Sequence, residues 1–261
     1  MELTIIDCHC HAGKGDGFSG PWDTEAPLRV FLERSKQAGI HKTVIFPAFH
    51  SDYSFANNEV ARIVAQHPGR LLGFAFVNAE ADKGRVFQMV KKAVHQYGFK
   101  GLKVHRHNAR ISREICEAAA YFNLPVLYDV LGDVSSISLF AAQYPSVNFI
   151  IPHLGSYADD WKIQSAFIDQ LVKHRNVYTD TSAVKRFDLL EEAFERAGAH
   201  KILFGTDGPW HHPGLELAKI WALEPSQQEA ALMLGGNFLR LVAQVKARPT
   251  GSPLVQIKSQ H

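Results

Sequence analysis

The chain has 261 residues, of which 46% are hydrophobic, and its 28 basic and 26 acidic residues give a formal net charge of +2. This composition is typical of a globular protein with a sizeable core and excludes a disordered chain. The near balance of charge provides no basic surface for nucleic acid or an anionic membrane. Three cysteines do not indicate a disulfide framework, and no stretch resembles a secretion signal or a membrane span. We therefore expect a cytoplasmic protein.

Short apolar segments alternate with amphipathic segments along nearly the whole chain. The predicted strands cover residues 5–11, 42–47, 71–77, 99–105, 124–130, 147–152, 176–180 and 201–205. Helices are predicted at residues 24–39, 57–67, 83–97 and 112–122, in a segment ending at 144, and at 159–175, 185–197, 214–223 and 226–245. Strands that alternate with helices indicate a parallel sheet with crossover helices.

The number of units distinguishes between two parallel architectures. Eight evenly spaced units favour a closed (β/α)8 TIM barrel over a doubly wound open sheet. We expect one domain over residues 1–247, followed by a tail over residues 248–261 that contains two prolines and a glycine.

Polar side chains occur where several predicted strands end. Side chains alternate along a strand, so His9 and His11 should share one face, and Cys8 and Cys10 the other. Two imidazoles on one face can bind a single divalent ion through neutral nitrogen atoms. Later strand ends carry Lys103, His105, Arg106, Asp129, His153, Thr206 and Asp207. One such residue alone usually caps a helix or contacts a loop, but their joint occurrence indicates an active site at the carboxyl ends of the strands.

Five segments resemble the amidohydrolase superfamily. Residues 7–11, Asp-Cys-His-Cys-His, are similar to its Asp-x-His-x-His signature. Residues 101–105, 151–155 and 204–209 resemble its later barrel motifs, and residues 235–241 resemble the closing helix of the amidohydrolase-related branch. That branch contains relatives of aminocarboxymuconate-semialdehyde decarboxylase and dicarboxylate lactonases.

The resemblance implies a role for each matching residue. His9 and His11 would bind one divalent metal, most often zinc, with manganese as the alternative. Asp207 would be a further ligand or the general base toward a metal-activated water, and His153 would polarise the substrate or position the water. A metal ion lowers the pKa of a bound water from about 15.7 toward about 7, which makes hydroxide available at neutral pH.

The fifth strand departs from the family pattern. Metal-dependent relatives usually have a histidine ligand at its end, where this chain has Asp129. Aspartate ligates zinc at about the same distance as imidazole. The expected ligands are therefore His9, His11, Asp129 and Asp207. A metal-free site, as in the lactonases of this branch, is the alternative.

The same end of the barrel provides candidates for substrate binding. Lys103, helped by His105 or Arg106, would bind a substrate carboxylate. We favour this role over a carboxylated lysine that bridges two metals. Aromatic residues in nearby loops are candidate pocket walls: Trp22, Phe49 and Trp210.

These inferences together predict an enzyme that uses a metal-activated water to hydrolyse a small carboxylate-bearing amide, ester or lactone. A non-oxidative decarboxylase on the same scaffold and a metal-free lactonase are the alternatives. A catalytically inactive, ligand-binding barrel is an alternative of another class. The expected partner is a small-molecule substrate, with no nucleic acid and no membrane. By analogy, the last helix and the tail are candidates for a homo-oligomer contact.

Overall fold

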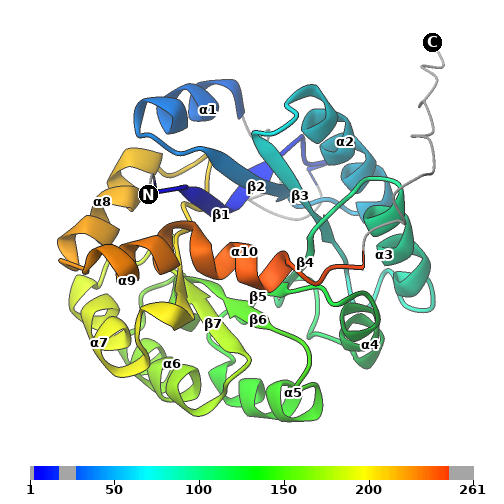
Figure 1. The fold of residues 1–261 in the computed structure, drawn as a ribbon. Helices are drawn as coiled ribbons and strands as arrows, with labels where there is room; N and C mark the ends of the chain where they lie inside the picture. Colours follow the sequence, from blue (N-terminus) through cyan, green and yellow to red (C-terminus); the bar gives the residue numbers. More distant parts are fainter. Residues whose placement is uncertain (1–2, 18–27, 247–261) are drawn as a thin grey trace.

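The computed structural model describes residues 3–17 and 28–246. Eight parallel strands form one sheet in chain order, each paired with the next. The strands are β1 (Ile6–Ala12), β2 (Lys42–Pro47), β3 (Leu71–Phe76), β4 (Gly101–His105), β5 (Val126–Asp129), β6 (Phe149–Ile151), β7 (Val177–Asp180) and β8 (Ile202–Leu203). The first strand meets the last, because Cys8 N donates to Phe204 O at 3.0 Å and Cys10 forms a parallel bridge with Gly208. The predicted single-domain (β/α)8 barrel is therefore confirmed (Figure 1).

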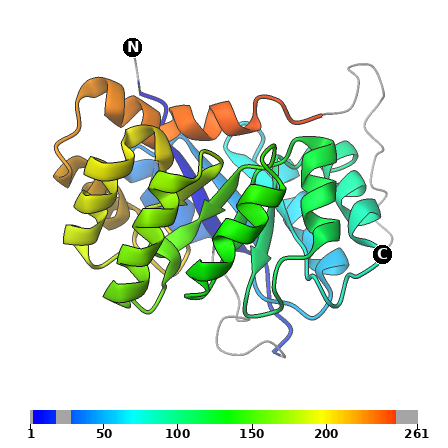
Figure 2. The same ribbon diagram turned by 90° about the horizontal axis from the view of Figure 1, so that it is seen from below.

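Helices surround the barrel, as the two ribbon views show (Figure 1, Figure 2). The outer helices are α1 (Leu28–Gln37), α2 (Tyr53–Gln66), α3 (Val86–His95), α4 (Arg113–Phe122), α5 (Ile137–Gln143), α6 (Trp161–Lys173), α7 (Phe187–Ala197) and α8 (Pro213–Ala222). Helix α2 begins four residues earlier than predicted, because the Asp52 side chain accepts hydrogen bonds from Ser54 N and Phe55 N and so caps the helix. The predicted residues 24–27 of the first helix and the tail from residue 248 lie outside the described residues.

The predicted helix at residues 226–245 is in fact three consecutive segments. They are α9 (Gln227–Ala231), a π-helical turn (Leu232–Gly236) and α10 (Asn237–Val242), which lies across the end of the barrel (Figure 1). Gly235 lies in the π turn, where a Cβ atom would come within 2.3 Å of Thr4 O. The chain at this point thus packs against the segment that leads into β1, which only glycine permits.

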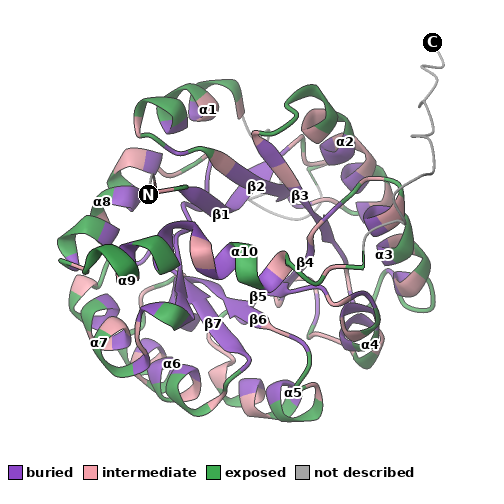
Figure 3. Cartoon of the chain, viewed as in Figure 1, coloured by how far each residue is buried: buried purple, intermediate pink, exposed green. Residues whose placement is uncertain are grey.

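Buried hydrophobic residues form two clusters, one inside the barrel and another between the sheet and the helices. Figure 3 colours the buried residues on the strands and helices. The predicted common face for Cys8 and Cys10 is wrong. Asp7 pairs with Thr43 but Cys10 pairs with Ile45, so three residues of β1 oppose two of β2. This irregularity places Cys8 in the inner layer and Cys10 in the outer one. Among the described residues, no helix combines the length and apolar character needed to cross a bilayer.

A buried carboxylate joins the first strand to the loop after the last strand. Asp7 accepts hydrogen bonds from Thr206 N at 3.0 Å, from Thr206 Oγ1 at 2.9 Å and from His9 N at 3.1 Å. Burial raises the pKa of Asp7 to about 7, and these donors oppose that rise. Hydrogen bonds to a charged group contribute about 2 kcal/mol each, so this contact stabilises barrel closure when Asp7 is ionised, above about pH 7.

We expect Thr206→Val to lower the free energy of unfolding by about 2 kcal/mol, because it removes one donor to the buried Asp7 while keeping the side-chain shape. Denaturant unfolding followed by circular dichroism measures the change. Thr206→Ser retains the hydroxyl and is the control. Equal stability of the valine and serine variants would contradict a role for this hydrogen bond in closure.

Candidate functional site

A cavity of about 130 Å³ opens at the carboxyl ends of the strands. Its lining consists of His9, His11, Phe49, Lys103, His105, Asp129, Leu131, His153, Tyr157, Asp207 and Trp210. The structure therefore brings together most of the polar strand-end residues that the sequence singled out. It also adds two walls that the sequence did not indicate, Leu131 and Tyr157.

Three of these side chains converge on one point. His9 and His11 come from β1, and Asp207 follows β8. Asp207 Oδ1 lies 3.2 Å from His9 Nε2 and 3.5 Å from His11 Nε2. All three residues are buried, and their ligand atoms lie within 4.8 Å of one another. This is a donor set suited to one divalent ion.

The other nitrogen atom of each imidazole faces an acceptor. His9 Nδ1 lies 2.9 Å from Asp180 Oδ2, and His11 Nδ1 lies 3.2 Å from the carbonyl oxygen of Pro47. Both acceptors require a proton on Nδ1, so in the neutral imidazoles the Nε2 lone pairs point toward Asp207. His9 Nε2 is buried and has no hydrogen-bond partner of good geometry. Three acceptors that face one another across a buried space fit a bound cation.

Without an ion, the two imidazoles differ in charge. Burial lowers the pKa of His11 to about 4, so this imidazole is neutral at pH 7. Burial and Lys103 also oppose a charge on His9, but Asp180 and Asp207 outweigh them and raise its pKa to about 9, so at pH 7 a bound ion would displace a proton from His9 Nε2. Burial likewise opposes ionisation of Asp207, yet hydrogen bonds with His11 and His9 hold its pKa well below the ordinary value. Asp207 therefore presents a negative charge to the two imidazoles.

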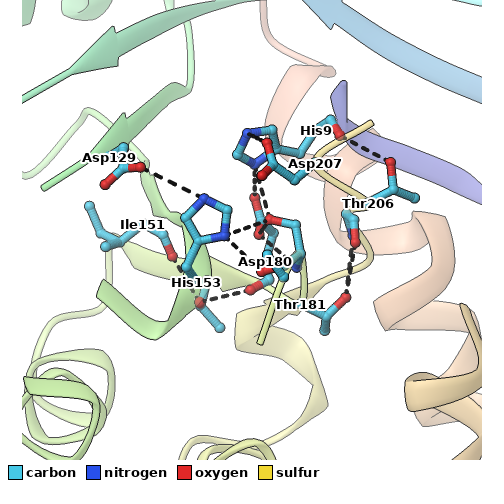
Figure 4. Close-up of polar contacts among 12 residues, drawn as sticks. His9, Asp129, Ile151, His153, Asp180, Thr181, Thr206 and Asp207 are labelled. Carbon is cyan, nitrogen blue, oxygen red and sulfur yellow. Dashed lines mark hydrogen bonds and ion pairs between the residues drawn. The ribbon is translucent and has the colours of Figure 1, made fainter. Parts of the chain in front are cut away.

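A second group of side chains lies across the cavity. Asp129 Oδ2 is 3.1 Å from His105 Nε2 and 3.7 Å from His153 Nε2 (Figure 4). Asp129, which was predicted to be a metal ligand, is not part of the cluster formed by His9, His11 and Asp207 in the described part of the chain. The cavity thus has two separate carboxylates, each beside two histidines.

One described residue that was predicted to bind substrate is not brought to the cavity. Arg106 is not among the lining residues, and its Nε lies 3.6 Å from Asp133 Oδ2. The backbone of Arg106 follows β4, but the side chain turns toward the loop after β5. Trp22 lies outside the described residues.

Two further residues of the site, Asp180 and Ser182, were not predicted from the sequence. Asp180 is fully buried and accepts hydrogen bonds from Ser182 N, Ser182 Oγ and His9. Burial opposes its ionisation, but the charge and hydrogen bond of His9 lower its pKa. Asp180 ends the predicted strand at residues 176–180, so the strand-end rule applied to the other strands would have identified it.

We expect Asp180→Asn to weaken zinc binding about 10- to 100-fold, the usual effect of losing a residue that orients a metal ligand. An asparagine amide can donate to His9 Nδ1, which would leave the proton on Nε2, where the ion must bind. Competition with a chromophoric chelator measures the affinity. Asp188→Asn, an exposed position on α7, is the control. Unchanged zinc affinity in Asp180→Asn would show that Asp180 does not orient His9.

Comparisons with known proteins identify the family and the fold. A family model described as amidohydrolase matches residues 6–243. No curated protein matches the chain.

Three solved structures illustrate the shared fold. A dihydroxybenzoic acid decarboxylase from Polaromonas sp. JS666, with bound manganese and the inhibitor 2-nitroresorcinol, is 16% identical over 93% of this chain and 97% of its own, with a TM-score of 0.69. A probable 2-pyrone-4,6-dicarboxylic acid hydrolase from Acinetobacter baumannii, with citric acid bound, is 17% identical over 92% and 100%, with a TM-score of 0.70. An amidohydrolase from Burkholderia multivorans with bound zinc is 11% identical over 92% and 99%, with a TM-score of 0.76.

At these identities the solved structures show a common fold, whereas the family match extends over almost the whole barrel. Because that match runs from β1 to the last helix and includes both histidines and Asp207, the chain belongs to the amidohydrolase family and is an enzyme.

Proposed function

We propose that the chain is a metal-dependent hydrolase that cleaves a small ester, lactone or amide bearing a carboxylate. The observation that carries this proposal is the convergence of His9 Nε2, His11 Nε2 and Asp207 Oδ1 in a cavity that also contains a buried lysine. The first three groups suit a cation that activates water, and the lysine suits the anion of a substrate.

His9, His11 and Asp207 would hold the ion, which we propose is zinc, with manganese as the alternative. Zinc accepts two imidazoles and a carboxylate in catalytic sites that keep an open position. A bound divalent ion would polarise the substrate carbonyl and lower the pKa of a water toward about 7. The zinc and manganese in the Burkholderia and Polaromonas structures support this choice of metal.

The chain itself provides the groups that move protons and hold charge. The Asp207 carboxylate is ionised and would take a proton from the attacking water. His153 Nδ1 lies 2.7 Å from the carbonyl oxygen of Ser182, so this nitrogen carries a proton and Nε2 faces the cavity. With a second proton on Nε2, His153 would donate a hydrogen bond to the oxyanion that develops on the substrate.

Lys103 is the group proposed to select a carboxylate. Its side chain is only 1% exposed, and its Nζ lies 4.9 Å from the centre of the Phe46 ring. No carboxylate of the described residues lies within ion-pair distance of this nitrogen. Burial lowers the pKa of Lys103, whereas Asp129 opposes that effect. A substrate carboxylate would supply the missing partner of this buried cation.

A non-oxidative decarboxylase is the second candidate function. The same lysine would hold the carboxylate near His153, which could return a proton to the carbon that loses carbon dioxide. The aromatic walls of the cavity favour a flat substrate, and the Polaromonas neighbour is a decarboxylase. The hydrolase remains the first proposal because Asp207 is placed to activate water.

We expect the zinc-loaded enzyme to hydrolyse at least one member of a panel of carboxylate-bearing lactones, esters and amides. Treatment with a chelator should abolish this activity, and added zinc or manganese should restore it, because the ion is needed to activate water. The products identify the reaction: incorporation of ¹⁸O from labelled water indicates hydrolysis. Release of carbon dioxide from aromatic carboxylates would instead establish the decarboxylase, and activity that survives chelation would establish a metal-free lactonase.

We expect Lys103→Met to lower kcat/KM about 10- to 100-fold on a carboxylate substrate, because an ionic hydrogen bond of about 1.5–3 kcal/mol is lost. A matched substrate whose carboxylate is a methyl ester should be affected little. Steady-state kinetics on both substrates measures the difference, and Lys91→Met on the exposed face of α3 is the control variant. An equal loss on the two substrates would exclude Lys103 as the carboxylate-binding residue.

A further inference from the structure

Asp129 has a complete set of contacts without a metal ion. Its Oδ1 accepts a hydrogen bond from Leu131 N at 2.8 Å. Its Oδ2 lies 3.1 Å from His105 Nε2 and 3.7 Å from His153 Nε2. The Asp129 carboxylate is thus fixed by the loop after β5 and by the His105 imidazole, and the His153 imidazole lies beside it.

The backbone determines the hydrogen-bond direction at His105. His107 N donates to His105 Nδ1 at 3.0 Å, so Nδ1 is an acceptor and carries no proton. The proton of the neutral ring must then be on Nε2, which donates to Asp129. His105 therefore acts as a donor toward Asp129, and its protonated Nε2 has no lone pair to offer a metal.

His153 has the opposite arrangement. Its Nδ1 is held by the Ser182 carbonyl oxygen at 2.7 Å, so the proton is on that side of the ring. Its Nε2 edge faces Asp129 at 3.7 Å, which is longer than a hydrogen bond. The Nε2 edge is therefore open to a substrate oxygen in the cavity, and the carboxylate lies beside it (Figure 4).

We propose that Asp129 is not a metal ligand but a positioning residue, which is held by His105 and sets the orientation and polarity of His153. The ion would then have three protein ligands, His9, His11 and Asp207, with its remaining positions available to water and substrate. This replaces the sequence-based expectation of a fourth ligand at Asp129. The part that concerns His153 rests on the proposed function, whereas the part that concerns the metal does not.

The two carboxylates of the active site would then have different roles: Asp207 binds the metal, and Asp129 positions His153. Asp207 lies with the histidines of β1, and Asp129 lies with those after β4 and β6. Replacing the Asp129 carboxylate by an amide would keep its volume but place an NH2 group toward one imidazole. That group would conflict with the Nε2 proton of His105 or occupy the Nε2 lone pair of His153.

Zinc affinity tests the first part and requires no turnover. Asp129→Asn should bind one zinc per chain with an affinity within about threefold of the original enzyme. Asp180→Asn is the matched comparison, since it should lose about 10- to 100-fold by disturbing His9. Circular dichroism confirms that each variant is folded, and Asp129→Ser is the second variant if the asparagine form does not fold. A loss of zinc in Asp129→Asn as large as that in Asp180→Asn would overturn the proposal.

Steady-state kinetics on a substrate from the panel tests the second part. Asp129→Asn should lower kcat about 100-fold or more and leave KM nearly unchanged, because the substrate carboxylate is held elsewhere. His105→Leu should lower kcat similarly, and His105→Gln, which retains a donor, should recover part of the loss. The double variant Asp129→Asn/His105→Leu should be no worse than Asp129→Asn, because His105 acts through Asp129.

The outcomes separate the two proposals. Additive losses in the double variant, or a rise in KM with unchanged kcat, would show that His105 contacts the substrate directly and would overturn the positioning role. If the original enzyme binds zinc but turns over no member of the panel, the proposed hydrolase fails, while the zinc affinity of Asp129→Asn still decides whether Asp129 is a ligand.

Discussion

The candidate site depends on closure of the barrel between β1 and the loop after β8. Asp7 accepts three hydrogen bonds there, and two of them come from Thr206, which is adjacent to Asp207 in the chain. The same contact therefore closes the sheet and brings Asp207 to His9 and His11. His11 N also donates to Gly208 O, which fixes the end of β1 to the loop after β8. Stability and ligand geometry thus share one buried interaction.

Closure of the barrel alone would not make a metal site, because either nitrogen of a neutral imidazole can carry the proton, and only the other nitrogen can bind a metal. The acceptors Asp180 and Pro47 remove this ambiguity for His9 and His11 by requiring a proton on each Nδ1. Two residues of the cavity have strained backbone conformations: Asp207 has φ 54° and His153 has φ 59°, in the left-handed region. Such conformations cost about 1 kcal/mol each for residues other than glycine. Their occurrence at two cavity residues agrees with a site that is built for chemistry.

Much of this arrangement could be predicted from the sequence because it follows from regular patterns. Alternation of apolar and amphipathic segments predicts the barrel, and strand ends in a parallel barrel must converge. Departures from regularity could not be predicted in this way. The extra residue in β1 places Cys8 on the opposite face from the predicted one, and the π turn at Gly235 divides the last helix. The Arg106 side chain points toward Asp133 and not into the cavity. Each depends on contacts between segments far apart in the chain.

The role of Asp129 could not be predicted from its own sequence segment. By residue type, an aspartate at the end of β5 is an acceptable zinc ligand, and nothing in its own segment argues otherwise. What distinguishes the two roles is the direction of a hydrogen bond at the end of the neighbouring strand β4, from His107 N to His105 Nδ1. That bond commits the Nε2 proton of His105 to Asp129, and a carboxylate that accepts this proton and the amide proton of Leu131 has little need of a metal. The role of a strand-end carboxylate is therefore decided by its neighbour's backbone, which residue types alone do not reveal.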